Sequence, residues 1–466
     1  MDKIFNLANI VLEFKQSIRL VLPIIATEIV YSSNSFISTI MVAYLGKEQL
    51  AANALVWGIY WAVIVFFIGI LSSVSIMAAH SFGAKDNAGV GICFKQGLIM
   101  AIIFSLPMML IMQYAPIILV WTGQDPMVIL YAKPFFSALI WTILPLNILM
   151  VVENFLIGIT KTRLVMILTI QSVPIGILFS YAFLFGKFGL PKIGLAGIGY
   201  GWTAAYSLLA TYGICCLVFS KQFKMYALFK NWWVIESKFL LEMIRIGLPM
   251  GFMWCSELVF FAIIAIMMGT LGTVVLAAYQ ISYQYIMIAL VILFALTNGV
   301  AVRVGNEVGK NNRDKLHLIV AVNMAIGLLV ISLFSLLYLI FPTAAISIDI
   351  DINSPNFKDV AAEAVKFFPI ISVLLISECI RIISTGALRG LKDSNLLMLI
   401  SMCGFWGIAF PGAYFLAFKL GFGGVGIWWG VVIGLSITGI TFLLRFRKLA
   451  SKANLVALVT RKDTVS

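Results

Sequence analysis

Charged residues are scarce in this 466-residue sequence: Asp, Glu, Lys and Arg make up 11% of it, while hydrophobic residues make up 62%. A typical soluble domain has about a quarter charged residues and about half apolar residues. The mean hydropathy of the chain is +1.07. This small number of charges cannot cover a water-facing surface. The composition therefore excludes an ordinary soluble protein and indicates a lipid bilayer as the main solvent.

Histidine and cysteine are also few. The two histidines, His80 and His317, lie far apart in the sequence, and most of the six cysteines fall inside apolar segments. This distribution argues against a histidine metal centre and against disulfides, and favours the cysteines as small packing residues. The sequence has no Walker A loop and no cluster of polar catalytic residues near one interface. We therefore expect neither an ATPase nor another enzyme, and no cofactor.

Twelve long apolar segments account for most of the chain. A hydrocarbon core of ~30 Å requires roughly 20 apolar residues per helix. Helices are favoured over a barrel because each helix satisfies its own backbone polar groups in lipid. The first segment has no small-residue cleavage site, so it is interpreted as a span and not as a signal peptide. We expect an all-α integral membrane protein with spans near 20–44, 50–79, 96–121, 134–158, 164–186, 193–219, 246–270, 273–302, 316–343, 367–389, 394–418 and 421–444.

The net charge of +13 is unevenly distributed along the chain. When Arg389, the last residue of its span, is counted with the loop that follows it, 24 Lys and Arg residues fall in the two termini and in the loops after spans 2, 4, 6, 8 and 10. The other loops hold 7. This bias is the positive-inside signature, so it predicts that both termini are cytoplasmic. The basic excess thus reflects topology and not nucleic-acid binding. We expect a monomer in the inner membrane, with membrane lipid as its surroundings.

The two halves of the sequence resemble each other. A shift of 226 positions places Pro23 on Pro249 and Gly83 on Gly309, and the Gly194–Gly201 run matches Gly423–Gly430 at a shift of 229. Each half holds six spans, so the halves share one orientation. We expect an N-terminal lobe at 1–220, a cytoplasmic linker at 221–245 and a C-terminal lobe with a basic tail at 246–466. A parallel repeat of this kind favours a secondary transporter with alternating access.

Glu257, Glu378 and Arg381 lie well inside the C-terminal spans. A charge at this depth is costly, so each is expected to face a cavity or a partner. Glu378 and Arg381 are i, i+3 neighbours, so they form a structural ion pair in one interpretation. In the other, Glu378 faces Glu257 and the two acids share a proton or a cation. Glu257 itself has a simpler alternative, as a neutral packing residue.

Met253 and Phe261 lie one turn on either side of Glu257 on the same helix face. One acid flanked by soft and aromatic surface suits a lipophilic cation. In the first span, polar residues recur at helical spacing and form a stripe that lines either water or another helix. These are Glu28, Tyr31, Ser32, Ser35, Ser38 and Thr39.

Longer motifs in the second half resemble those of one transporter family. They are Arg245–Gly251 (RIGLPMG), Met268–Gly272 (MGTLG), Leu276–Gln280 (LAAYQ), Ala301–Gly309 (AVRVGNEVG), Gly386–Asp393 (GALRGLKD) and Gly426–Gly430 (GIWWG). Together with Glu257 and Glu378 they resemble the multidrug and toxic compound extrusion (MATE) transporters, in particular the NorM-like branch, over nearly the whole chain.

This resemblance implies an antiporter that expels organic cations and other amphipathic drugs against inward sodium or proton flow. It implies a cation site in the C-terminal lobe formed by Glu257 and Glu378, which would be the ligands of a sodium ion. It also implies drug contacts at Phe261, Gln280 and Gln284.

The sequence departs from the NorM-like pattern at three positions. Ser38 stands where an aspartate is usual, Glu378 replaces another usual aspartate, and Arg381 replaces a neutral glutamine. Coupling is therefore expected to depend on the C-terminal acids, with Arg381 as a possible modulator. The competing interpretation is a flippase for lipid-linked saccharides, which belongs to the same superfamily and requires a cationic cavity.

Overall fold

The computed structural model describes residues 6–231, 233–350, 354 and 357–459, without the side chains of 31–36. Within these residues every regular element is helical. The long helices are α1 (Leu7–Ala43), α2 (Lys47–Leu71), α3 (Ser73–Gly83), α4 (Asn87–Tyr114), α6 (Pro126–Ile140), α7 (Ile143–Gly158), α8 (Thr162–Phe185), α9 (Ala196–Phe219), α10 (Ser237–Thr270), α11 (Thr273–Gly309), α12 (Asp314–Ile340), α14 (Lys358–Gly390), α15 (Ser394–Met402) and α17 (Gly423–Lys452). Short elements are α5 (Pro116–Trp121), η1 (Lys221–Tyr226), α13 (Pro342–Ile346), η2 (Cys403–Ala409), α16 (Phe410–Tyr414), η3 (Phe415–Lys419) and α18 (Leu455–Leu458).

The membrane spans agree with those expected from hydropathy. Ten helical segments among the residues searched are long and apolar enough to cross a bilayer, and the bent pair α6–α7 makes eleven. The remaining expected span, 20–44, corresponds to α1, whose side chains at 31–36 are not described. With α1 the number of spans is twelve, as expected. Several helices extend beyond their apolar windows: α10 begins at Ser237 and α17 continues to Lys452. Amphipathic turns at the helix ends explain this difference, because hydropathy detects only the part that requires lipid.

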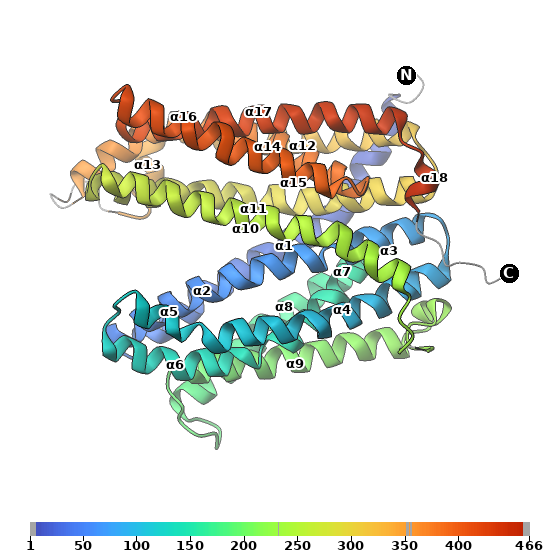
Figure 1. Ribbon diagram of the computed structural model, residues 1–466, viewed down its shortest axis with the longest axis horizontal. Coiled ribbons are helices and arrows are strands. Elements are labelled where there is room, and N and C mark those ends of the chain that lie inside the picture. Colours follow the sequence, from blue (N-terminus) through green and yellow to red (C-terminus); the bar gives the residue numbers. More distant parts are fainter. Residues whose placement is uncertain (1–5, 232, 351–353, 355–356, 460–466) are drawn as a thin grey trace. The chain divides into compact units, whose positions relative to one another are not determined.

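The chain forms two compact units. Unit 1 contains the residues before Leu22 and Phe252–Leu458, and unit 2 contains Leu22–Gly251. In unit 1, α14 packs against α11, α12 and α17; in unit 2, α9 packs against α6, α7 and α8. Within each unit Figure 1 shows long helices side by side, in warm colours for α12, α14 and α17 and in cyan to green for α6, α8 and α9.

Glycines at four-residue spacing allow close helix packing in both units. A methyl group at Gly197 of α9 would lie 2.6 Å from the backbone carbon of Phe183 on α8. A methyl group at Gly426 of α17 would lie 2.7 Å from the backbone of Leu416 on η3, and the series continues through Gly430 and Gly434. Small residues at this spacing let helix backbones approach in a membrane, where packing replaces the hydrophobic effect. These are the two glycine runs that the internal repeat aligns.

The division into units differs from the expected lobes at both ends of the first half. The expected linker 221–245 packs within unit 2, where the ring of Phe229 lies 5.8 Å from that of Phe94 and the Lys95 side chain donates to the Lys230 carbonyl at 2.9 Å. The first residues of α1 belong instead to unit 1. The chain passes between the units next to Pro23 and Pro249, the prolines that the repeat aligns.

Polar contacts from Arg303 and Asn323 explain why the start of α1 joins unit 1. Arg303 of α11 forms a buried, bidentate ion pair with Glu13, in which its Nε lies 3.0 Å from Glu13 Oε1. Arg303 also donates to Gln16, and Asn323 of α12 donates to Ser17 Oγ at 3.0 Å. These partners lie far from Glu13 in sequence, so hydropathy alone does not predict them.

We expect Arg303→Met to lower the free energy of unfolding by about 3–5 kcal/mol, because Glu13 would remain buried without its cation. Thermal unfolding of the purified protein in detergent measures this effect. The double variant Glu13→Gln/Arg303→Met should recover part of the loss, because it removes both charges. Equal unfolding temperatures for wild type and Arg303→Met would contradict a structural role for this pair.

Candidate functional site

Two helices of unit 1 bring the predicted membrane charges together. Helix α10 carries Glu257, and α14 carries Glu378 and Arg381 on adjacent turns of one face. Of the two acids, Glu378 is buried, with 2% of its side chain exposed, whereas 20% of the Glu257 side chain is exposed. The two acids therefore differ in access although they share one partner.

Arg381 bridges the two carboxylates. Its Nη2 donates to Glu257 Oε1 at 2.6 Å, and its Nη1 donates to Glu257 Oε2 at 3.3 Å. Its Nε and Nη2 donate to Glu378 Oε2 at 3.0 and 2.8 Å. One guanidinium thus compensates two carboxylates, so the cluster formally carries one negative charge. The ion pair of Glu378 with Arg381 is present, and Glu257 contacts the same guanidinium. That the two acids share a proton or a coupling cation stays a prediction.

The surroundings of Arg381 hold its side chain in place. Its guanidinium carbon lies 5.4 Å from the ring centroid of Phe405, within the range of a cation–π contact. Phe405 lies in η2, a π-helical segment, and the neighbouring Trp406 donates to Ser256 Oγ at 2.8 Å. A methyl group at Gly439 of α17 would lie 3.1 Å from the backbone nitrogen of Arg381. Segments of π-helix are frequent at functional sites.

The predicted substrate contacts occupy different environments. Met253 is fully buried, and Phe261 lies against Tyr283 of α11, with 5.5 Å between ring centroids. Gln280 and Gln284 are exposed on α11, and the Gln284 amide lies 3.4 Å from Asp349 Oδ1. Phe261 is one turn from Glu257, so an aromatic surface adjoins the more accessible acid.

The predicted polar stripe of the first span is only partly described. Glu28 is half-buried and Ser38 is buried, whereas the side chains of Tyr31 and Ser35 lie outside the described residues. Another acid of unit 2, Glu153, accepts a hydrogen bond from Thr169 at 3.1 Å. The role of the stripe remains a prediction.

Three features of the site were missed by sequence reasoning. Phe405 and Trp406 were not singled out beside the cluster because a π-helical segment has no hydropathy signature. Arg389 was counted with a cytoplasmic loop, but it is buried at the end of α14. It donates to Asn298 at 3.3 Å and lies 5.6 Å from the Trp254 ring. A signal was available, because Arg389 falls two turns after Arg381 on the same helix.

Comparison with known proteins identifies the family. The MatE family model matches residues 23–182 and 249–415, once in each half and over more than half of the chain. The chain belongs to the MatE family. The double match agrees with the internal repeat, and the all-helical, two-lobed membrane fold agrees with a family of membrane transporters.

Curated relatives of this MatE protein cover nearly its full length. It is 30% identical over 450 residues to a probable multidrug resistance protein NorM from Pseudomonas putida, covering 95% of this chain and 96% of the relative. It is 25% identical over 436 residues to a probable multidrug resistance protein NorM from Synechocystis, covering 94% and 95%.

Solved structures show the same fold. One is an outward-facing multidrug resistance MATE family transporter of the MOP superfamily, with a TM-score of 0.85 and 17% identity over 96% of this chain and 97% of the other. Another is the eukaryotic MATE transporter AtDTX14, with a TM-score of 0.80 and 22% identity over 96% and 99%.

Proposed function

We propose that this MatE protein exports organic cations and amphipathic drugs from the cytoplasm in exchange for sodium ions or protons. It would work as a monomer in the inner membrane, with both termini cytoplasmic and no cofactor besides the coupling ion. The names of the NorM relatives support the drug substrates. The observation that carries the coupling part of the proposal is the buried Glu257–Arg381–Glu378 cluster.

The charge of the cluster limits what it can take up. With Arg381 already between the carboxylates, a sodium ion has no ready cage of acids, and the described residues contain no group of three potential metal ligands. An incoming sodium ion must displace the Arg381 guanidinium from some of its carboxylate contacts. A proton needs only one carboxylate oxygen. Either would meet Glu257 first, because more of its side chain is exposed. An organic cation would compete for the same carboxylate, assisted by the ring of Phe261.

Exchange follows if the competing cations favour different states of the transporter. Binding of the coupling ion would favour the state that releases drug outward, and its departure to the cytoplasm would free Glu257 for the next drug. Each ligand must bind the two states with different affinity, because equal affinity would shift no equilibrium.

Ethidium efflux from proteoliposomes tests this function. We expect efflux when a sodium or proton gradient is imposed separately, at least tenfold above that of liposomes without gradient, and the effective gradient identifies the coupling ion. If neither gradient moves ethidium or another cationic dye, the drug-antiport proposal fails. Transfer of a lipid-linked saccharide would then be measured, since the flippase is the alternative within the superfamily.

A further inference from the structure

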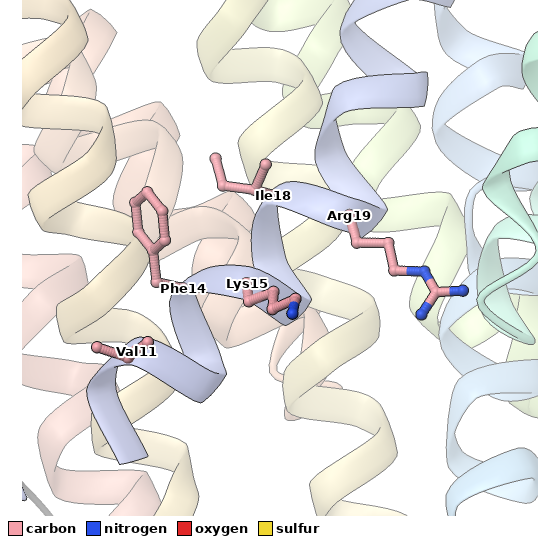
Figure 2. Close-up of a pocket in the computed structure, with 5 residues that line it drawn as sticks. All are labelled: Val11, Phe14, Lys15, Ile18 and Arg19. Atoms are coloured by element: carbon pink, nitrogen blue, oxygen red, sulfur yellow. The ribbon is translucent and has the colours of Figure 1, made fainter. Parts of the chain in front are cut away.

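A groove on the first helix is separate from the charge cluster. It has a volume of about 480 Å³ and is lined by Val11, Phe14, Lys15, Ile18 and Arg19 of α1. Figure 2 shows Val11, Phe14 and Ile18 on one side of the helix, Arg19 at the other edge and Lys15 between them. At 100° per residue these positions cover an arc of about 140°, with an apolar edge and a basic edge.

The opposite face of the same turns is firmly held. Glu13 is paired with Arg303, and Ser17 Oγ accepts a hydrogen bond from Asn323. Both side chains are buried, with 3% and 1% of their surface exposed. The groove face is therefore presented in a defined orientation and is not the surface of a free terminal helix.

The groove residues lie just before the first expected membrane span, which begins at residue 20. Lys15 and Arg19 precede that apolar run, so their long side chains can reach the headgroup layer while their stems remain in apolar surroundings.

The basic edge has no counter-charge among the residues that the structure describes. Lys15 and Arg19 are both exposed and are i, i+4 neighbours, so their charges repel. Among the described residues no ion pair is formed by either one. A phosphate diester would offset both charges, and Arg in particular suits its oxygens. The positive-inside bias places this end of α1 at the cytoplasmic leaflet, whose surface is anionic.

We infer that this groove binds one anionic phospholipid of the cytoplasmic leaflet. Its phosphate lies between Lys15 and Arg19, and the first part of an acyl chain lies against Phe14 and Ile18. Such a lipid would brace the segment of α1 that joins unit 1. This site is independent of the proposed drug export, because it shares no residue with the cluster.

Native mass spectrometry of the purified protein tests the inference, with phosphatidylglycerol and phosphatidylcholine of identical chains as probes. We expect wild type to retain one phosphatidylglycerol in preference to phosphatidylcholine. Lys15→Gln/Arg19→Gln should weaken this retention by about tenfold or more, since two basic contacts to an anionic lipid are lost. The control Lys221→Gln/Lys224→Gln removes the same charge from exposed positions of η1 and should retain lipid like wild type.

The other occupants give different results. Equal retention of both lipids, or equal retention by wild type and Lys15→Gln/Arg19→Gln, would overturn the proposal. Phe14→Ala should also weaken phosphatidylglycerol retention; if it does not, or if inorganic phosphate at millimolar concentration displaces the lipid, a bare phosphate site replaces the lipid groove. A dimer peak that disappears in Lys15→Gln/Arg19→Gln would assign the face to a second copy instead. Melting curves of both variants confirm that they are folded.

Discussion

Arg381→Gln is expected to unfold at a clearly lower temperature than wild type at neutral pH in sodium-free buffer. The substitution leaves Glu257 and Glu378 side by side, each without the guanidinium that now contacts it at 2.6–3.3 Å. Breaking a buried ion pair costs about 3–5 kcal/mol when a charge stays uncompensated. Two neighbouring carboxylates do not both ionise easily, so the variant should regain stability when a proton or a sodium ion neutralises one of them. Thermal unfolding in detergent, measured across pH and sodium concentration, shows both effects.

Lys366→Gln is the matched control for Arg381→Gln. Lys366 lies on the same helix, α14, and pairs with Glu363 at 2.6 Å, but 60% of its side chain is exposed. An exposed pair of this kind contributes about 0–1 kcal/mol, so its loss should hardly change the unfolding temperature. If Arg381→Gln unfolds like this control and responds to neither sodium nor pH, Arg381 does not compensate the two acids.

Glu257→Gln and Glu378→Gln are expected to reduce gradient-driven ethidium efflux by at least tenfold. In either variant the remaining acid and Arg381 form a neutral pair, so the cluster loses the negative charge that a coupling ion or a drug cation would compensate. The two variants should differ in binding. Glu257→Gln should weaken the affinity for ethidium more than Glu378→Gln does, because Glu257 is the more accessible acid and lies beside Phe261. Efflux from proteoliposomes and fluorescence titration of ethidium measure the two effects.

Glu363→Gln controls for loss of an acid from α14, since Glu363 lies outside the cluster and pairs only with an exposed lysine among the described residues. It should pump like wild type. Normal efflux by both cluster variants would refute the assignment of coupling to Glu257 and Glu378. Glu28 and Glu153 would then be tested by the same substitutions, because they are the acids at membrane depth in unit 2.

The residues of the charge cluster could be predicted from sequence, but the hydrogen bonds among them could not. A carboxylate at membrane depth requires a partner, so Glu257 and Glu378 are conspicuous in spans that are otherwise apolar. The spacing of Glu378 and Arg381 predicts one ion pair. The second pair, between Arg381 and Glu257, joins residues 124 positions apart and depends on how α10 packs against α14. The same holds for Phe405 and Trp406, which a π-helical segment brings to the cluster.

The sequence by itself determined the class of the protein, its spans and its repeat. These follow from local properties, because each span is an apolar stretch long enough for the bilayer and the repeat is visible as matching residues. Tertiary structure decided to which unit each segment belongs. For example, the start of α1 belongs to unit 1, where Glu13 pairs with Arg303. It also decided that one guanidinium holds both acids of the cluster. Contacts between distant segments depend on helix packing, and no periodicity along the chain encodes them.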